Sequence, residues 1–84
     1  MAEGLSGAAP LDAGWAALGG GQWERARASF EESLAGGETP EALEGMGWVG
    51  HMLDEDRLTF GARERAYRLY LERGDRGSAA RMAA

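Results

Sequence analysis

His51 is the only imidazole in the chain, and cysteine is absent. Catalysis would need a partner for this ring, such as a thiol, a hydroxyl on a strained turn or a nearby carboxylate. Ser29 and Ser33 instead lie within a helical pattern, and Glu31 and Glu32 are adjacent on it and point apart. Without cysteine, a zinc site of the Cys/His kind is also excluded. We therefore expect no enzyme activity, no metal and no cofactor.

Residues 45–50 match the G-x-G-x-x-G pattern of dinucleotide sites letter for letter. Such a site needs a strand before the glycines, so that the pyrophosphate meets the start of a helix. Here residues 39–44 read as a capped helix start, and Trp48 would crowd the phosphate. We expect Gly47 and Gly50 to allow close helix packing instead.

Two further short motifs have simple structural interpretations. Residues 54–56 resemble the opening of a calcium loop, but Thr59 and Arg65 stand where that loop needs its glycine and its final glutamate. Residues 73–75 spell Arg-Gly-Asp, which a glycine at a helix C-terminus followed by a capping aspartate explains. Neither motif predicts a ligand.

The composition predicts an all-α protein. The 84 residues suit one small domain. Only Val49, Thr39 and Thr59 are β-branched, whereas Ala, Leu, Glu and Arg, which favour helices, fill the chain. No apolar run reaches the roughly 20 residues of a membrane helix, and no signal peptide opens the chain. We expect a cytoplasmic protein that does not bind a membrane.

Glycine and proline divide the chain into about five helices. We expect residues 1–9 to be a flexible terminus and residues 10–84 to be a single helical domain. Within it, the expected elements are a hairpin over 10–35, a hairpin over 40–73 and a partial helix over 76–84. The expected N-caps are Thr39, Asp54 or Asp56, and Asp75, and the expected left-handed C-caps are Gly36-Gly37 and Gly74.

An internal repeat relates the two hairpins. Gly14-Trp15 recurs as Gly47-Trp48, and 48 − 15 = 33. Periods near 33–34 residues with two helices per unit are typical of helix–turn–helix solenoids. The sequence therefore predicts antiparallel helical hairpins stacked as a short solenoid.

Residues 21–34 resemble the second half of a tetratricopeptide unit, with aromatic, small and large residues at Trp23, Ala26 and Phe30. In the second repeat, Thr59 and Arg63 replace the small residue and the aromatic. The resemblance implies a tetratricopeptide-like module whose function is protein–protein interaction without catalysis.

A narrower resemblance is carried by residues 38–45, 62–70 and 73–76. These segments are similar to the helical-repeat regions of actinobacterial LuxR-type transcriptional regulators. That resemblance implies a role in transcription regulation, as part or relative of a larger regulator. In that family a separate C-terminal helix-turn-helix domain reads DNA, and nothing in this chain corresponds to it.

The resemblance to tetratricopeptide arrays also implies a binding groove, because the first helix of each hairpin lines a concave face in that family. Mapped onto this chain, the groove residues are Trp15, Glu41, Glu44, Trp48, His51 and Met52. Two tryptophans one repeat apart would anchor a peptide or helix of a protein partner. The alternative is that Trp15 and Trp48 belong to the core between the hairpins.

The net charge of −5 hides an asymmetry between the two parts of the chain. Residues 1–56 carry 2 − 11 = −9, and residues 57–84 carry 7 − 3 = +4. The simplest interpretation is that the two parts attract each other or a neighbour. An Arg-rich surface that binds nucleic acid is the less favoured alternative, because Asn, Gln and Lys are not interleaved with the arginines.

The C-terminal end of the solenoid gives a further alternative, self-association. Helical repeats usually close with a polar outer face, but this end presents apolar residues. Those that we expect to pair, with a second copy or with residues of a longer parent chain, are Tyr67, Tyr70, Leu71 and Met82. On this interpretation the chain is a homodimeric structural subunit.

Overall fold

Residues 8–83, which the structure describes, form five helices and no strand. In this computed structural model the helices are α1 (Ala8–Gly19), α2 (Trp23–Ala35), α3 (Pro40–Met52), α4 (Asp56–Arg73) and α5 (Arg76–Ala83). The prediction of an all-α fold is confirmed. The stretch predicted to be a flexible terminus, residues 1–9, overlaps α1, because Ala8 and Ala9 belong to that helix. The rest of that stretch, residues 1–7, lies outside the described residues, as does residue 84.

Three helix boundaries follow signals that the sequence carries locally. Thr39 Oγ1 accepts a hydrogen bond from the amide of Ala42 at 3.3 Å and begins α3. Gly74 ends α4 in the left-handed conformation, with a φ of 86°. Asp75 Oδ1 then accepts a hydrogen bond from the amide of Ser78 at 3.0 Å and begins α5. Each cap satisfies a backbone group that a helix end leaves unpaired.

Two capping predictions are wrong. Gly36 is right-handed, with φ −84° and ψ −5°, because its amide still bonds back into the last turn of α2. The positive φ, 141°, falls one residue later at Gly37. The N-cap of α4 is Glu55, because Asp54 forms the left-handed turn before it and Asp56 is already the first helical residue.

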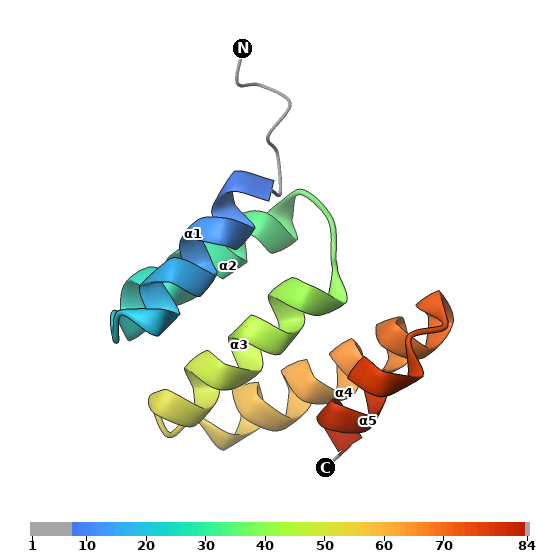
Figure 1. The fold of residues 1–84 in the computed structure, drawn as a ribbon. Coiled ribbons are helices and arrows are strands. Elements are labelled where there is room, and N and C mark those ends of the chain that lie inside the picture. The colour runs from blue at the N-terminus through green and yellow to red at the C-terminus, as the bar shows by residue number, and fades with distance from the viewer. Residues whose placement is uncertain (1–7, 84) are drawn as a thin grey trace.

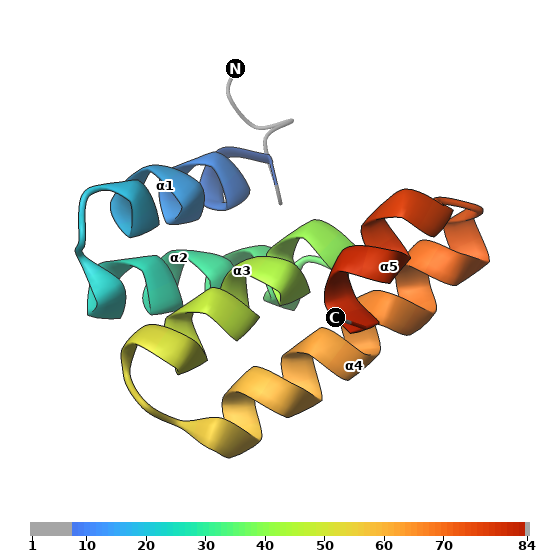
Figure 2. The same cartoon turned by 60° about the horizontal axis from the view of Figure 1, so that its bottom comes forward.

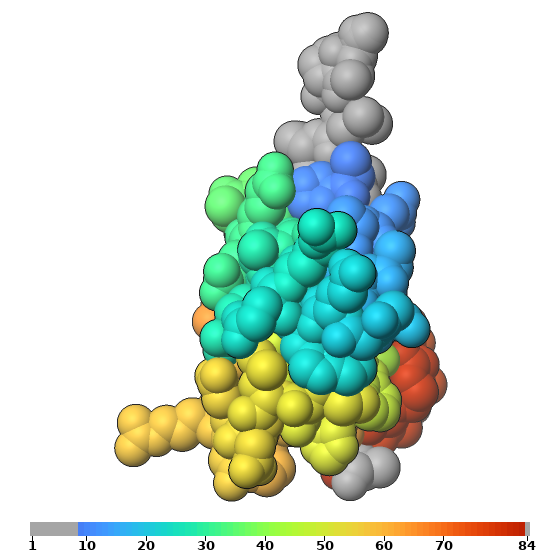
Figure 3. All heavy atoms as spheres, turned by 90° about the vertical axis from the view of Figure 1, so that its left-hand side faces the viewer, coloured from blue at the N-terminus to red at the C-terminus, as the bar shows by residue number. Residues whose placement is uncertain are grey.

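The helices form antiparallel pairs, α1 with α2 and α3 with α4, and α5 lies along the C-terminal half of α4 (Figure 1). Helix α2 packs against α3 and joins the two hairpins, while α1 lies over α2 and α5 over α4 (Figure 2). The turns within both hairpins lie at one end of the molecule, where Figure 3 shows them on one face in cyan and yellow. This arrangement is that of an all-α, repeat-like fold.

The repeat of 33 residues reappears in the geometry of the two hairpin turns. Gly21, between α1 and α2, has a φ of 77°, and its equivalent Asp54, between α3 and α4, has a φ of 60°. Aspartate is one of the few residues besides glycine that tolerate this conformation. The turns also share a hydrogen bond, from the amide of Gln22 to the carbonyl of Ala17 (2.9 Å) and from the amide of Glu55 to the carbonyl of Gly50 (2.8 Å).

Phe30 is the centre of the core between the two hairpins. Its side chain is fully buried and lies against glycines of two other helices. A Cβ built on Gly14 of α1 would lie 2.6 Å from the ring, and one built on Gly45 of α3 would also overlap it. Trp15 meets the same ring edge to face, with centroids 5.4 Å apart. The two glycines therefore let α1 and α3 approach one aromatic side chain.

In the second hairpin, a smaller residue on one helix compensates for a larger residue on the other. Ala17 and Ala26 both lie in the core of the first hairpin. Their equivalents, 33 positions later, are Gly50 and Thr59. A Cβ on Gly50 would lie 2.6 Å from Thr59 Oγ1 and 2.8 Å from its backbone nitrogen, so the larger threonine requires the glycine. Close helix packing at Gly50, predicted from the sequence, is confirmed.

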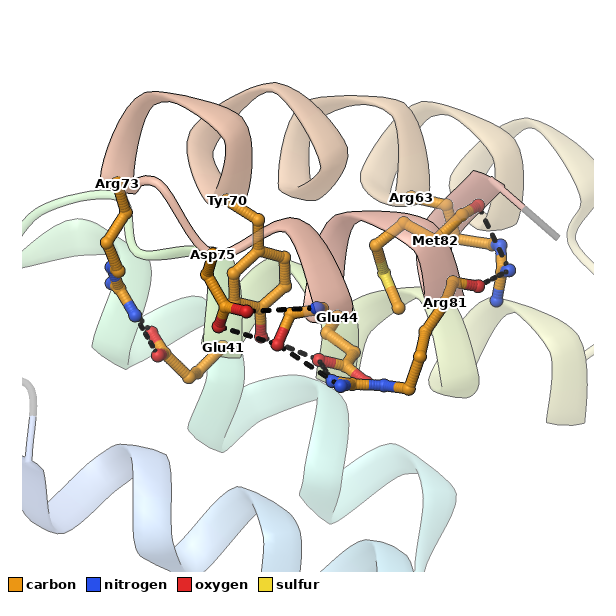
Figure 4. A network of polar contacts seen from close by, with 9 residues as sticks. Glu41, Glu44, Arg63, Tyr70, Arg73, Asp75, Arg81 and Met82 are labelled. Carbon is orange, nitrogen blue, oxygen red and sulfur yellow. Dashed lines mark hydrogen bonds and ion pairs between the residues drawn. The ribbon is translucent and has the colours of Figure 1, made fainter.

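Arg63 of α4 occupies the repeat position that Phe30 holds in α2. Its Nη2 donates hydrogen bonds to the carbonyls of Arg81, at 2.9 Å, and Met82, at 3.1 Å (Figure 4). Both carbonyls belong to the last turn of α5, where the helix leaves its oxygens unpaired and partially negative. The guanidinium therefore caps α5 and holds it on the second hairpin.

Candidate functional site

Three of the residues predicted to line a groove lie at the C-terminal end of α3. The side chain of Trp48 is 44% exposed, that of Met52 is 43% exposed, and His51 is exposed as well. The rings of Trp48 and His51 meet edge to face, with centroids 6.0 Å apart. For Trp48, the alternative of a core position is therefore wrong.

Trp15 has a different environment from its repeat equivalent Trp48. It is half-buried and packs against the core through its edge-to-face contact with Phe30. Trp48 lacks such a partner, because the residue in the position of Phe30 is Arg63, which is engaged with α5. The groove prediction is corrected here, since Trp15 packs against the core between the hairpins, which is the alternative that the sequence left open.

The two acidic residues predicted for the groove are engaged by α4 and α5 (Figure 4). Glu41 Oε1 accepts a hydrogen bond from Arg73 Nη2 at 3.1 Å. Glu44 Oε1 accepts one from the hydroxyl of Tyr70 at 2.7 Å and another from Arg81 Nη2 at 3.0 Å. These carboxylates hold the helices together, so neither is a free groove residue.

The same contacts shift the protonation equilibria of the network. Hydrogen bonds from Arg73 lower the pKa of Glu41 below its usual range. Burial raises the pKa of Tyr70, and its hydrogen bond to Glu44 raises it further. The guanidinium of Arg73 also lies over the ring of Tyr70, 5.8 Å from its centroid. At neutral pH the network therefore holds a charged Glu41 and a neutral Tyr70.

The charge asymmetry of the chain is compensated within the molecule. Acidic residues around α3 pair with arginines of other helices, in the pairs Glu38–Arg65, Glu41–Arg73, Glu44–Arg81 (3.0 Å) and Glu55–Arg27 (2.6 Å). Three of these four arginines lie in the basic C-terminal part. The prediction that the acidic and basic parts attract each other is confirmed.

The predicted self-association surface is largely closed by the chain itself. Tyr70 is 3% exposed and Met82 is 7% exposed, and both belong to a core cluster that α5 completes. The contact of Glu44 with Arg81 and the capping of α5 by Arg63 hold α5 in the position that completes this cluster. Of the other residues predicted there, Leu71 is exposed and Tyr67 is half-buried. Tyr70 and Met82 are therefore not surface residues that could meet a second copy.

A pocket of about 430 Å³ lies between the C-terminal end of α3 and the N-terminal part of α4. Its lining includes Trp48, His51, Asp54, Asp56, Phe60 and Arg63. The side chain of Phe60 is 67% exposed, the highest value among the exposed large apolar side chains. Helix α5 lies along the C-terminal half of α4 and not along the N-terminal part that contributes to this pocket (Figure 1).

The sequence interpretation missed the α4 side of this pocket. Asp56 was assigned to helix capping, and Phe60 was not singled out. A signal was present, because the repeat equivalent of Phe60 is Arg27, and 60 − 33 = 27. An aromatic residue at a position that is charged in the other repeat indicates a surface used for contact.

The pocket is suited to noncovalent binding. Trp48 and Phe60 offer aromatic faces, and Asp54 and Asp56 offer carboxylates. Among the described residues of the lining, Thr59 has the only hydroxyl, and it donates to the carbonyl of Glu55 at 3.1 Å. Within residues 8–83, no group of three or more His, Cys, Asp or Glu side chains could hold a metal ion.

Comparison of the chain with protein-family models, with curated proteins and with solved structures found no match. The resemblance to tetratricopeptide arrays and to LuxR-type regulators therefore rests on the sequence patterns described above. Among the described helices, none combines the length and apolar character that would let it cross a membrane.

Proposed function

We propose that this chain is a non-catalytic protein–protein interaction module of the tetratricopeptide type. The observation that carries the proposal is the pair Trp48 and Phe60, which come from adjacent helices and stay exposed on the lining of one pocket. Exposed aromatic residues that meet at a concave site are typical of the anchors of protein interfaces.

The repeat architecture supports the same proposal. Hairpin turns with equivalent geometry at Gly21 and Asp54 are what a stacked helical repeat requires. Repeat modules of this kind act by presenting a surface to a partner and not by chemistry. The similarity to LuxR-type regulators makes transcription regulation the process in which we expect the module to act.

Binding of proteins from an extract of the native cells tests this function. The immobilised wild-type chain is compared with a Trp48→Ser, Phe60→Ser double variant and with Leu71→Ser. Leu71 is a matched control because its exposed fraction, 45%, is close to the 44% of Trp48, but it does not line the pocket. Mass spectrometry should identify proteins that Leu71→Ser retains and the double variant loses. Equal retention by both variants would contradict the function.

Self-association and nucleic-acid binding have less support. Of the seven arginines from residue 57 onward, five form hydrogen bonds or ion pairs within the chain: Arg63, Arg65, Arg68, Arg73 and Arg81. We expect DNA retention to be weak and lost at low salt, since few arginines are free to contact phosphates. Sedimentation equilibrium measures self-association separately, and a concentration-dependent mass would favour a homodimer.

A further inference from the structure

We propose that the pocket between α3 and α4 binds an arginine side chain of a protein partner. In the partner, apolar residues flank this arginine. This inference rests on the interaction function proposed above and specifies the chemistry of the partner. It follows from the aromatic surface of the pocket, from its charge, and from a site elsewhere in the molecule that already holds an arginine.

The aromatic surface of the pocket comes from two helices. Trp48 of α3 is 44% exposed, and Phe60 of α4 is 67% exposed. Both line the pocket, as does His51. Tryptophan gives the strongest attraction to a cation placed over its face, and the neighbouring ring adds apolar contact area.

The charge of the pocket favours a cationic ligand. The carboxylates of Asp54 and Asp56 form no ion pair or side-chain hydrogen bond with any residue from 8 to 83. Arg63, the one arginine in the lining, directs its guanidinium to the carbonyls of α5. The described residues of the lining carry a formal charge of 1 − 2 = −1, and the positive group among them is already engaged. Both aspartates therefore remain able to pair with a cation from a partner.

Elsewhere in this molecule, an aromatic ring and a carboxylate already hold an arginine. The guanidinium of Arg73 lies 5.8 Å from the ring centroid of Tyr70 and pairs with the carboxylate of Glu41. An aromatic face and a carboxylate together thus hold an arginine between α3 and α4. The pocket presents the same two kinds of group to solvent. Trp48 stands in place of Tyr70 as the aromatic residue, and Asp54 and Asp56 stand in place of Glu41 as the carboxylates.

Arginine fits this combination better than lysine. Its planar guanidinium stacks on aromatic rings and forms paired hydrogen bonds with a carboxylate, whereas the lysine ammonium is compact and strongly hydrated. Apolar residues next to the arginine would cover Phe60, which lines the pocket and is 67% exposed. A short protein segment supplies both features, so we specify a peptide and not a free cation.

Selection from a displayed library of random peptides on the full chain tests the inference. We expect the enriched peptides to share an arginine next to apolar residues. Labelled copies of an enriched peptide, with arginine or with glutamine at that position, are then titrated with the protein. Fluorescence anisotropy should show that the glutamine copy binds about tenfold more weakly, as expected for the loss of one cation–aromatic contact and one partly exposed charged pair.

A charge-matched pair of double variants locates the contact. Asp54→Asn with Asp56→Asn removes the two pocket carboxylates, and asparagine tolerates the left-handed conformation of residue 54. Glu31→Gln with Glu32→Gln makes the same change of net charge on the exposed face of α2. The pocket variant should lose about tenfold in affinity for the arginine peptide, and the α2 variant should stay within about twofold.

Two results would overturn the arginine inference: a glutamine peptide that binds as tightly, or a pocket variant that binds like the wild type. If the Trp48→Ser, Phe60→Ser variant still loses the peptides in those cases, the interaction function stands without the arginine. Enrichment of no peptide at all would overturn both proposals.

Discussion

Phe30 of α2 and Gly45 of α3 are in such close contact that a Cβ on Gly45 would overlap the phenyl ring. The ring is fully buried, and it also lies against Gly14 of α1. Because the ring is fully buried and lies against two helices besides its own, it has little space into which it could move. The distance between the two hairpins is therefore set by the absence of a side chain at Gly45.

Gly45→Ala should destabilise the fold, although alanine is a better helix former than glycine. Overlap with the enclosed ring costs about 3 kcal/mol, whereas the gain in helix propensity is about 1 kcal/mol, so we expect a net loss of about 2 kcal/mol. Chemical denaturation followed by circular dichroism measures the free energy of unfolding. Gly61→Ala is the control, because a Cβ at Gly61 of α4 would meet nothing within 4 Å. It should stabilise the fold by about 0.5–1 kcal/mol, and an equal loss in both variants would contradict this account of Gly45.

Arg63→Met should loosen α5 and leave the two hairpins intact. Methionine keeps an apolar stem next to Gly47, which Arg63 Cγ approaches, but it removes the hydrogen bonds to the carbonyls of Arg81 and Met82. Loss of a cation at a helix C-terminus costs about 1 kcal/mol. Amide hydrogen exchange in α5 should therefore become about fivefold faster, while exchange in α2 stays unchanged. Uniformly faster exchange would show that Arg63 stabilises the whole fold and not α5.

Most of the fold could be predicted because its signals are local. Thr39, Gly74 and Asp75 mark helix ends through residues within four positions of each, and the turn at Asp54 repeats the turn at Gly21. These features depend on backbone conformation and capping, which the residue types themselves decide. These three helix ends and the repeat were therefore visible in the sequence.

The site could be predicted only in part, because docking of α5 depends on contacts between distant residues. Arg81 reaches Glu44 across 37 positions, and Arg63 reaches Met82 across 19. No local pattern shows such pairings, so Glu44 was assigned to the groove, and Met82 to an open surface. For Trp48 the sequence left groove and core open, and only the structure, with this side chain 44% exposed, decides for the surface.

Stability in acid should depend on the pair of Glu41 and Arg73. Since the pKa of Glu41 is lowered in the folded protein, the folded state binds fewer protons at this site than the unfolded chain. The stabilisation is complete above the ordinary value of 4.5 and is lost as the pH falls through the lower folded value. Arg73→Met should therefore reduce stability at neutral pH and flatten the decline in acid, as measured by thermal melts over a pH series. Glu41→Gln should give the same flatter decline, and an unchanged slope in both variants would contradict the role of this pair.

Trp15 and Trp48 provide a matched comparison, because they hold equivalent positions one repeat apart and differ in their partners. Trp15 packs edge to face on the buried ring of Phe30, so Trp15→Ala should cost about 3 kcal/mol. Trp48 is 44% exposed, and its ring contact is with the exposed His51, so Trp48→Ala should cost about 1 kcal/mol or less. In a domain of this size each kcal/mol corresponds to a shift in Tm of roughly 4–8 °C, so thermal melts separate the two variants clearly. Trp48→Ala should lose partner binding with a nearly unchanged Tm. A collapse of its melting transition would show instead that Trp48 supports the fold and is not an anchor for a partner.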